Sequence, residues 1–451
     1  MAVIGAGIVG VTTAYELLCD GHEVTMFERR SSVAVESSFA NAGLLAPGYV
    51  TPWAAPGMLR KVLRQWGRRD AAVRLAGFPN PALGAWLWRW WQACDPAHHV
   101  PNRAAMLALA TRSLARTRAL SEALGIEYER ARGLLVLLRS ERELAASRAG
   151  LRLLAELEVG FHVVDAAVCR RIEPALDAST ELRAGIHLPS AEVGNCRQFA
   201  LALKAELQRR GATLKFSQTV ERLTPATGDG PQKGLAQGVD VTSWALAPDA
   251  ESAFAGAGAG AVGTSAPGER QHEHFDAVVV CAALQSQALL RPLGLRLPLQ
   301  PVFGYSITLP VRHFEAHPDV GPFACLMDER YKVAITRLGD RVRVAGGAEL
   351  GGVLTRHSPA PIATLHRVLQ DWFPSAAHPA RAQTWKGARP MLPDGPPAIG
   401  ACGVPGVWLN TGHGSSGWAL ACGSAQLVAE ALAGRPPSMD TERFSPLRWR
   451  S

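Results

Sequence analysis

The first 29 residues constrain the fold more than any other stretch of the chain. A short apolar run, Ala2 to Ile4, is followed by the glycine pattern Gly5-Ala6-Gly7-Ile8-Val9-Gly10 and by an apolar stretch from Ile8 to about Leu18. A second apolar run, Glu23 to Phe27, then ends on Glu28. This order predicts a strand, a tight turn, a helix and a parallel strand, the βαβ unit of a dinucleotide-binding fold.

Each position of this turn has a physical role in such a site. Gly5 permits the tight turn, Gly7 lets the backbone approach a pyrophosphate, and Gly10 allows the helix to pack closely on the sheet. The helix N-terminus offers N–H groups and partial positive charge to phosphates, and Glu28 is placed to accept hydrogen bonds from ribose hydroxyls. The alternative is an ordinary glycine-rich turn. Because only four residues precede Gly5, we expect the natural chain to start slightly upstream.

Composition excludes several other classes of protein. The chain has 451 residues, enough for two domains, and a formal charge of +8. Only six of its 47 basic residues are lysines, so a bias towards arginine explains the charge as well as a nucleic-acid partner would. No zinc-finger spacing or basic heptad pattern occurs, and we therefore expect no nucleic-acid binding.

Cysteine spacing and hydropathy indicate a reducing compartment. The eight cysteines include no C-x-x-C pair, so we expect free thiols, no disulfide framework and no metal site. Residues 1–15 lack a basic leader and carry the turn glycines, so we expect no signal peptide. The weakly charged stretch 395–429 is broken by prolines and glycines and is not a membrane span. We expect a cytoplasmic protein.

The remaining pattern predicts an α/β fold. Helices are expected over 57–75, 83–92, 102–125, 141–160, 197–210, 364–372 and 418–432, and strands over 134–138, 213–216, 219–223, 275–280, 302–309, 331–337, 342–346 and 407–409. Residues 225–270 are rich in Gly, Ala, Pro and Ser, which predicts a disordered or flexible loop with one short strand at 239–244.

Nucleotide-binding elements are expected at both ends of the chain and in its middle. We therefore predict a Rossmann-like cofactor-binding domain formed by 1–58, 189–298 and 383–451. Residues 59–188 and 299–382 form an interleaved α+β substrate domain with a large mixed or antiparallel sheet.

Further motifs make the chain recognisable. They are Ser38-x-x-Asn-Ala-Gly43, Pro47-Gly-Tyr49, Ala54-Ala-Pro-Gly57, Gly304-Tyr-Ser306, Tyr331-Lys-Val-Ala-Ile-Thr-Arg337, Arg389-Pro-x-x-Pro-Asp-Gly395 and Asn410-Thr-Gly-His-Gly-x-x-Gly-Trp418. With these motifs the chain resembles, nearly end to end, the D-amino-acid dehydrogenase small subunits, FAD enzymes of the D-amino-acid oxidase and glycine oxidase superfamily. Two departures are Ala283, where that family commonly has Gly, and the long 225–270 segment.

The resemblance implies FAD as the cofactor. Its ADP half would lie at Gly5–Gly10 and Glu28, its adenine against the backbone of Val220, and its flavin near Asn41–Gly43 and Gly412–Gly417. The alternative for Gly412–Gly417 is a simple loop. The residues expected to contact FAD are Ile4, Gly5, Ala6, Gly7, Ile8, Val9, Gly10, Glu28, Arg29, Ser37, Ser38, Asn41, Ala42, Gly43, Leu44, Val220, Gly387, Gly412, His413, Gly414, Ser415, Ser416 and Gly417.

The resemblance also implies an amino-acid site, because a guanidinium binds a carboxylate bidentately. Arg389 would bind the substrate carboxylate; the alternative is a surface ion pair. Tyr305 would hydrogen-bond the same carboxylate, unless it is a core tyrosine. Lys332 would face the flavin from a strand, unless it is a solvated strand residue. Tyr49 and His413 would close the pocket and contact the flavin.

The implied reaction is oxidative deamination of D-amino acids resembling D-alanine. Hydride would pass from the substrate Cα to the flavin, and the imino acid would hydrolyse to a 2-oxo acid and ammonia. The electrons would then pass to a quinone or another non-oxygen acceptor. The alternatives are an oxygen-using glycine or sarcosine oxidase, a non-catalytic dinucleotide sensor, and an enzyme that uses NAD.

A quinone acceptor requires contact with a membrane. Residues 57–75 combine arginines and a lysine with apolar side chains, and Trp86, Trp88, Trp90 and Trp91 follow shortly afterwards. This pattern predicts peripheral contact with the inner face of the cytoplasmic membrane. The alternative is that the tryptophans pack a core and the arginines are merely solvated.

Overall fold

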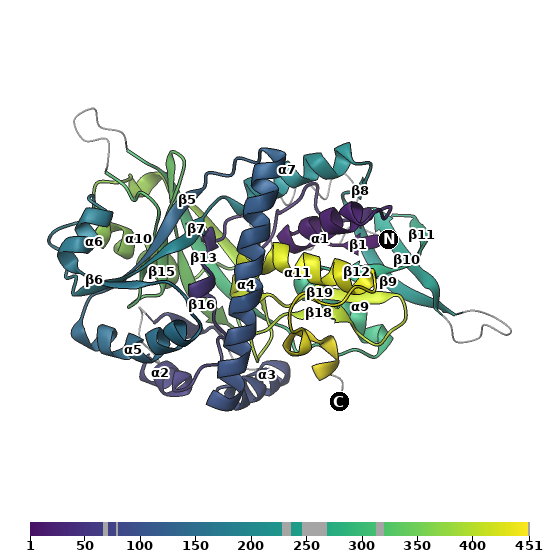
Figure 1. Ribbon diagram of the computed structural model, residues 1–451, viewed down its shortest axis with the longest axis horizontal. Helices are drawn as coiled ribbons and strands as arrows, with labels where there is room; N and C mark the ends of the chain where they lie inside the picture. Colours follow the sequence, from purple (N-terminus) through teal and green to yellow (C-terminus); the bar gives the residue numbers. More distant parts are fainter. Residues whose placement is uncertain (66–70, 78–79, 228–235, 246–267, 313–319, 450–451) are drawn as a thin grey trace.

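The structure is a computed structural model, and it describes residues 1–65, 71–77, 80–227, 236–245, 268–312 and 320–449 (Figure 1). Its strands form a six-stranded, a ten-stranded and a three-stranded sheet. The expected fold class is confirmed, because a Rossmann-like sheet is interleaved along the chain with a large mixed sheet.

The six-stranded sheet contains the N-terminal βαβ unit. Its strands lie in the order β18 (Ala398–Ala401), β19 (Val407–Thr411), β12 (Val278–Val280), β1 (Ala2–Ile4), β2 (Thr25–Phe27) and β8 (Thr213–Lys215). All neighbours are parallel except β18 and β19. Helices α1 (Ile8–Cys19), α7 (Cys196–Arg209) and α11 (Gly417–Leu432) share one apolar cluster on this sheet. The carboxyl end of β1 therefore leads directly into α1, as predicted.

The ten-stranded sheet forms the other half of the molecule (Figure 1). Its main path is β17 (Gln383–Met391), β13 (Gln300–Pro310), β16 (Arg341–Leu350), β15 (Val333–Leu338), β14 (Cys325–Asp328), β5 (Ala131–Leu138), β7 (Ala184–Val193) and β3 (Leu44–Leu45). Two further strands pair beside it, β4 (Val73–Leu75) with β16 and β6 (His162–Asp165) with β7. Strands β3 and β17 pair in this sheet, although both come from segments that were assigned to the cofactor domain. The domain boundaries themselves stay a prediction.

The three-stranded sheet confirms the strand expected at 239–244 and adds regular structure to the segment 225–270. Strands β9 (Gln218–Thr227), β10 (Ala236–Ala245) and β11 (Arg270–Phe275) pair as an antiparallel sheet, so this segment contains more regular structure than its composition indicated. Residues 228–235 and 246–267 lie outside the described residues. The single strand expected over 275–280 is wrong. Phe275 pairs with β10 and Val278–Val280 with β1, because one apolar run serves two sheets.

The long helix α4 (Pro96–Leu124) runs between the two large sheets, as Figure 1 shows. Asp95 caps its N-terminus by accepting a hydrogen bond from the N–H of Ala97, Pro96 occupies the first turn, and Gly125 ends it at a φ of 62°. The other α-helices among the described residues are α2 (Met58–Gln65), α3 (Pro81–Gln92), α5 (Glu141–Glu156), α6 (Ala166–Ile172), α9 (Ser286–Leu290) and α10 (Pro359–Trp372).

Two expectations near the substrate side are corrected. The helix expected over 57–75 ends within the described residues at Gln65, and Val73–Leu75 is instead strand β4. This strand pairs with residues 348–350 of β16, beyond the part of β16 that pairs with β15. Lys332 precedes β15 rather than lying on it, and it has a φ of 53°.

Candidate active site

The turn between β1 and α1 is shaped by two glycines. Gly5 has a φ of 102°, and a Cβ added to it would lie 2.8 Å from the carbonyl oxygen of Cys281. A Cβ on Gly10 would lie 1.8 Å from the carbonyl oxygen of Gly5. The helix can therefore approach the strand only without a side chain at position 10, which is the packing role predicted for this glycine.

Glu28 closes the same turn from the end of β2. One carboxylate oxygen accepts a hydrogen bond of 2.7 Å from the N–H of Ala6, and the other accepts one of 2.9 Å from the N–H of Arg30. Burial raises the pKa of Glu28, although both backbone hydrogen bonds oppose that shift. The carboxylate is thus held in place beside the cavity, where the predicted ribose contact would occur.

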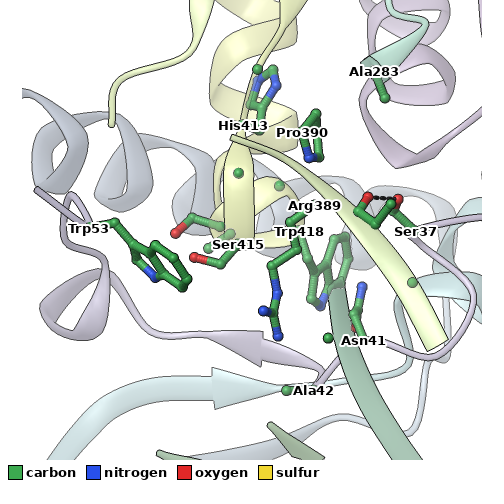
Figure 2. Close-up of a pocket in the computed structure, with 18 of the residues that line it drawn as sticks. Ser37, Asn41, Ala42, Trp53, Ala283, Arg389, Pro390, His413, Ser415 and Trp418 are labelled. Carbon is green, nitrogen blue, oxygen red and sulfur yellow. Dashed lines mark hydrogen bonds between the residues drawn. The ribbon is translucent and has the colours of Figure 1, made fainter. Parts of the chain in front are cut away.

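Ser37 and Ser38, which follow β2, connect the β1–α1 turn with the large sheet. Ser38 Oγ accepts a hydrogen bond of 3.1 Å from the N–H of Ile8 in the first turn of α1. Ser37 Oγ donates one of 2.5 Å to the carbonyl oxygen of Ala388 in β17 (Figure 2). The segment that contains both serines therefore contacts the nucleotide helix and the strand that carries Arg389.

Residues 40–42, which follow the two serines, are held by strands β13, β15 and β16 of the ten-stranded sheet. The carbonyl oxygens of residues 40–42 accept hydrogen bonds from Ser306 Oγ at 2.9 Å, Arg343 Nη1 at 3.2 Å and Thr336 Oγ1 at 2.8 Å, in that order. Burial lowers the pKa of Arg343 to about 10. Three consecutive carbonyls bound to one sheet give this segment a rigid position at the cavity wall.

The glycine turn before α11 forms the opposite wall. Gly412 and Gly414 have φ values of 82° and 55°. The ring of His413 turns into the protein, where Nε2 lies 3.0 Å from Ser424 Oγ, and burial lowers its pKa to about 3. In Figure 2 this imidazole and the guanidinium of Arg389 point in opposite directions. We therefore correct the expected side-chain role of His413, which leaves its backbone to line the cavity.

All of these segments line one cavity with a volume of about 1040 Å³. Every residue predicted to contact cofactor or substrate lines it, except Ala6 and Gly10. Gly10 shapes the turn, and contact of the cofactor with Ala6 and Gly10 stays a prediction. The cavity thus unites residues from all three parts of the chain assigned to cofactor binding, together with the five candidates for substrate chemistry.

Arg389 lies in the cavity wall on β17. Its Nη1 donates a hydrogen bond of 2.8 Å to the carbonyl oxygen of Gly347, and burial lowers its pKa to about 10. No acid among the described residues pairs with it, so the surface ion pair considered as its alternative does not fit. A Cβ on Gly304 would lie 2.3 Å from Nη2, so the guanidinium can lie across β13 only because position 304 is glycine.

The carbonyl that holds Arg389 belongs to a β-bulge. The pairing of β13 with β16 shifts between Phe303 and Tyr305, and Gly347 has a φ of 71°. A bulge leaves one residue outside the regular ladder and re-aims its groups. Here it turns the carbonyl of Gly347 towards the guanidinium, a contact that the sequence analysis did not predict.

Behind this bulge lies a buried polar cluster. The Tyr305 hydroxyl donates a 2.9 Å hydrogen bond to Glu349 and accepts one of 3.1 Å from the N–H of Ser358. Lys386 Nζ donates to Glu349 at 2.8 Å, and the two side chains are 1% and 3% exposed. The only O–H of Tyr305 is therefore committed within the protein, which favours the core alternative over a hydrogen bond to substrate.

Tyr49 and Lys332 form a second polar pair at the cavity. Lys332 Nζ lies 5.7 Å from the centroid of the Tyr49 ring and pairs with Glu329. Burial opposes the charged form of Lys332, but Tyr49 and Glu329 outweigh it and raise the pKa of the amine. Burial raises the pKa of Tyr49 to about 12. At neutral pH the amine is therefore charged and the phenol neutral.

Sequence reasoning missed several residues of this site. Gly347, Glu349 and Lys386 carry no motif, because their roles depend on the register between β13, β16 and β17. Trp53 lines the cavity near Ser415 (Figure 2), and only its position just before the Ala54–Gly57 motif could have indicated it.

The donor groups of the cavity fit a flavin dinucleotide. Two helices of 12 and 16 residues, α1 and α11, begin at its wall, and their N-termini suit the negative charge of a pyrophosphate or a reduced flavin. Glu28 lines the cavity just after β2, where the contact with the ribose is predicted. Ala283, at a φ of 48°, places a methyl group where such a fold commonly has glycine, yet it leaves the cavity continuous.

Comparisons with known proteins identify the family of the chain. Residues 1–431 match the family described as DAO, FAD dependent oxidoreductase. The D-amino acid dehydrogenases of Cereibacter sphaeroides and Rhizorhabdus wittichii are each 38% identical over 443 residues. These residues are 98% of this chain and 93% and 98%, respectively, of the relatives. The D-amino acid dehydrogenase of Rhizobium rhizogenes is 36% identical over the whole chain and 99% of its own length.

Solved structures share the fold at lower identity. Glycine oxidase from Geobacillus kaustophilus has a TM-score of 0.68 at 18% identity and covers 99% of this chain and 98% of its own. L-proline dehydrogenase from P. horikoshii has a TM-score of 0.65 at 16% identity, with coverage of 100% and 97%. The chain therefore belongs to the family of FAD-dependent oxidoreductases, and FAD is its cofactor.

Proposed function

We propose that this protein oxidises D-amino acids to 2-oxo acids and ammonia, with FAD as the first electron acceptor. The observation that carries the proposal is Arg389, a half-buried guanidinium without an acid partner among the described residues, in the wall of the cofactor cavity. A partly desolvated cation is costly unless a ligand neutralises it, and a carboxylate matches its fork of donors. The relatives named D-amino acid dehydrogenase supply the substrate class.

The chain's own residues orient the substrate. Gly347 fixes one edge of the Arg389 guanidinium, so its remaining N–H groups are available for the substrate carboxylate. Bound FAD supplies the hydride acceptor for the Cα–H bond. The substrate loses two electrons and two protons to form the imine C=N bond, and water then adds and releases ammonia. Because Tyr49 stays protonated and Lys332 charged at neutral pH, they act as hydrogen-bonding and charge partners rather than as bases.

The visible spectrum of the purified protein tests this function. A yellow protein that is bleached anaerobically by D-alanine, but not by L-alanine, is the expected result. A yellow protein bleached by no D-amino acid would instead support a non-catalytic dinucleotide sensor. A colourless protein would support NAD as the cofactor.

For the second half of the reaction we propose a quinone as the electron acceptor. The relatives are named dehydrogenases rather than oxidases, which supports an acceptor other than oxygen. Turnover with D-alanine and a quinone under nitrogen, compared with peroxide formation in air, tests the proposal. Stoichiometric peroxide as the main product would support an amine oxidase.

We also propose peripheral contact with an anionic membrane through α2 and α3. Within the described part of the chain, no helix is long and apolar enough to cross a bilayer. The four tryptophans of α3 divide into two pairs: Trp86 and Trp90 are buried, whereas Trp88 and Trp91 are 59% and 46% exposed. The core-packing alternative therefore accounts for only one pair. Residues 66–70, which belong to the predicted basic segment, lie outside the described residues.

Sedimentation with anionic liposomes tests this contact. The protein should bind at low salt and dissociate at high salt, because basic residues near anionic lipid contribute about 1 kcal/mol each. The double variant Trp88→Ser/Trp91→Ser should lose binding. The matched control Phe323→Ser removes an aromatic ring that is 46% exposed elsewhere and should bind normally. Equal binding by both variants would contradict the proposed surface.

A further inference from the structure

The positively charged side chains that line the cofactor cavity divide into two pairs. Arg29 and Lys332 each form an ion pair with a neighbouring glutamate. Among the described residues of the lining, the other two are Arg103 and Arg389, and neither of them pairs with an acid. The cavity therefore contains a second unpaired guanidinium besides the one assigned to the substrate carboxylate.

The acidic side chains of the same lining already have partners. Glu36 and Glu329 form the two ion pairs just described, and Glu221 pairs with Arg270. Glu28 accepts hydrogen bonds from two backbone N–H groups. The carboxylate of bound D-alanine would neutralise one guanidinium and leave the other unpaired. Because an unpaired, partly desolvated cation is costly, the charges of the cavity favour a ligand with a second carboxylate.

Arg103 lies far from the expected phosphates of the cofactor. It is one turn after His99 on α4, and His99 Nδ1 lies 2.7 Å from the carbonyl oxygen of Ala54. A Cβ added to Gly150 of α5 would lie 3.9 Å from Arg103 Nη1, so the guanidinium reaches the neighbouring helix. Figure 1 shows α5 on the half of the molecule formed by the ten-stranded sheet, whereas α1 lies on the other half. The pyrophosphate expected at α1 is therefore not the missing partner.

The two unpaired guanidiniums belong to different walls of the cavity. Arg389 extends from strand β17 and is held by the carbonyl oxygen of Gly347, whereas Arg103 extends from α4 beside Gly150 of α5. A guanidinium binds a carboxylate through two parallel hydrogen bonds. A ligand with two carboxylates joined by an aliphatic chain would therefore match one cation on the sheet and one on the helices.

We propose that Arg103 binds the side-chain carboxylate of an acidic D-amino acid whose α-carboxylate is bound at Arg389. The inference rests on the proposed function and extends its substrate class to D-2-aminodicarboxylic acids such as D-glutamate. The reaction at Cα is unchanged. The substrate loses two electrons and two protons to form the imine, and hydrolysis then gives a 2-oxo dicarboxylic acid and ammonia.

A comparison of D-glutamate with D-glutamine tests the proposal. The two amino acids have the same shape and differ in the charge at the end of the side chain, so the ratio of their kcat/KM values cancels any general loss of activity. Loss of a hydrogen-bonded charge pair in Arg103→Met should lower this ratio about 10- to 100-fold. The control Arg148→Met removes an exposed arginine of α5 that does not line the cavity, and should keep the ratio. An unchanged ratio in Arg103→Met overturns the proposal.

A carboxylate supplied by the protein gives the complementary test. Gly150→Glu places an acid within reach of Arg103, and Gly150→Gln places an amide of the same size there. Both changes replace a glycine inside a helix by a stronger helix former, so both variants should fold. Gly150→Glu should lower the ratio as Arg103→Met does, and Gly150→Gln should lower it much less. If both lower it equally, bulk rather than charge decides the preference, and the proposal is wrong.

Binding of glutarate to the oxidised holoenzyme, measured by calorimetry, requires no turnover. The matched monocarboxylate is pentanoate, which has the same number of carbons. A wild-type preference for glutarate that disappears in Arg103→Met supports the site even if no D-amino acid bleaches the flavin. Equal affinities for the two acids in wild type reject it, even if D-alanine is oxidised. Failure of this inference is thus distinguished from failure of the proposed function.

Discussion

The two ends of the cavity differ in the kind of group that lines them, backbone at one end and side chains at the other. At the nucleotide end the important groups are backbone: the N–H groups of the β1–α1 turn, space left by Gly5 and Gly10, and the start of a helix. At the substrate end the important groups are side chains from neighbouring strands, such as Arg389, Glu349 and Lys386. A backbone site depends on local spacing, whereas a side-chain site depends on sheet register. The two ends should therefore fail independently when mutated.

Removal of Lys386 should have the largest effect. Lys386→Met leaves the Glu349 carboxylate in the core without its cationic partner, which costs about 3–5 kcal/mol of stability. The bulge at Gly347 lies two residues from Glu349, so the KM for D-alanine should rise severalfold while FAD remains bound. Urea unfolding and steady-state kinetics measure the two effects.

The double variant Lys386→Met/Glu349→Leu is the control for this prediction. It removes both charges and should recover most of the lost stability. If it also restores KM, the pair contributes only to stability and does not position Arg389. Loss of FAD from either variant would show that the two ends of the cavity are not independent.

Arg389→Ala should have the next largest effect. The loss of a charge-assisted bidentate contact costs about 2–4 kcal/mol, or roughly 30- to 1,000-fold in kcat/KM for D-alanine. The visible spectrum should be unchanged, since no group of the nucleotide end contacts the guanidinium within the described residues. The matched variant Gly304→Ala keeps the arginine but displaces it, and should reproduce much of the loss. Normal kinetics in Arg389→Ala would assign carboxylate binding to another residue.

The same difference explains which parts of the site could be predicted from the sequence. Gly10 and Glu28 were predicted from spacing alone, because Gly10 packs on Gly5 and Glu28 accepts hydrogen bonds from Ala6 and Arg30 within one βαβ unit. Arg389 was identified only through its motif, since its partner Gly347 lies 42 residues away across two strands. The polar cluster around Tyr305 could not be predicted, because alternation along β13 does not reveal that Glu349 faces it. The break after Phe275 was missed for a similar reason: tertiary pairing divides an apolar run that has no local interruption.

Replacement of His413, which lies between the two ends of the cavity, should give a smaller effect on stability that depends on pH. Burial lowers the pKa of His413 from 6.5 to about 3, so the folded state resists protonation more than the unfolded chain does. Its contribution to stability is therefore complete above pH 6.5 and falls as the pH drops from 6.5 towards 3, by about 1.4 kcal/mol per unit. Comparison of urea midpoints for wild type and His413→Asn should show a shallower acid-side decline in the variant. Parallel curves would assign the acid sensitivity to other groups.

The smallest expected effect concerns Ala283. Its methyl group lies at the nucleotide end of the cavity, where the other important groups belong to the backbone. Its φ of 48° is left-handed, which costs an alanine about 1 kcal/mol relative to glycine. Ala283→Gly should therefore raise the free energy of unfolding by at most about 0.5 kcal/mol, since the greater flexibility of glycine in the unfolded chain offsets much of the relief. Ala34→Gly is the matched control, because Ala34 has a φ of 54° but does not line the cavity. Both variants should gain stability, but only Ala283→Gly should bind FAD more tightly, about two- to fivefold by fluorescence titration. If Ala34→Gly tightens FAD equally, the gain comes from general stabilisation, and the methyl group of Ala283 does not restrict the approach of the cofactor.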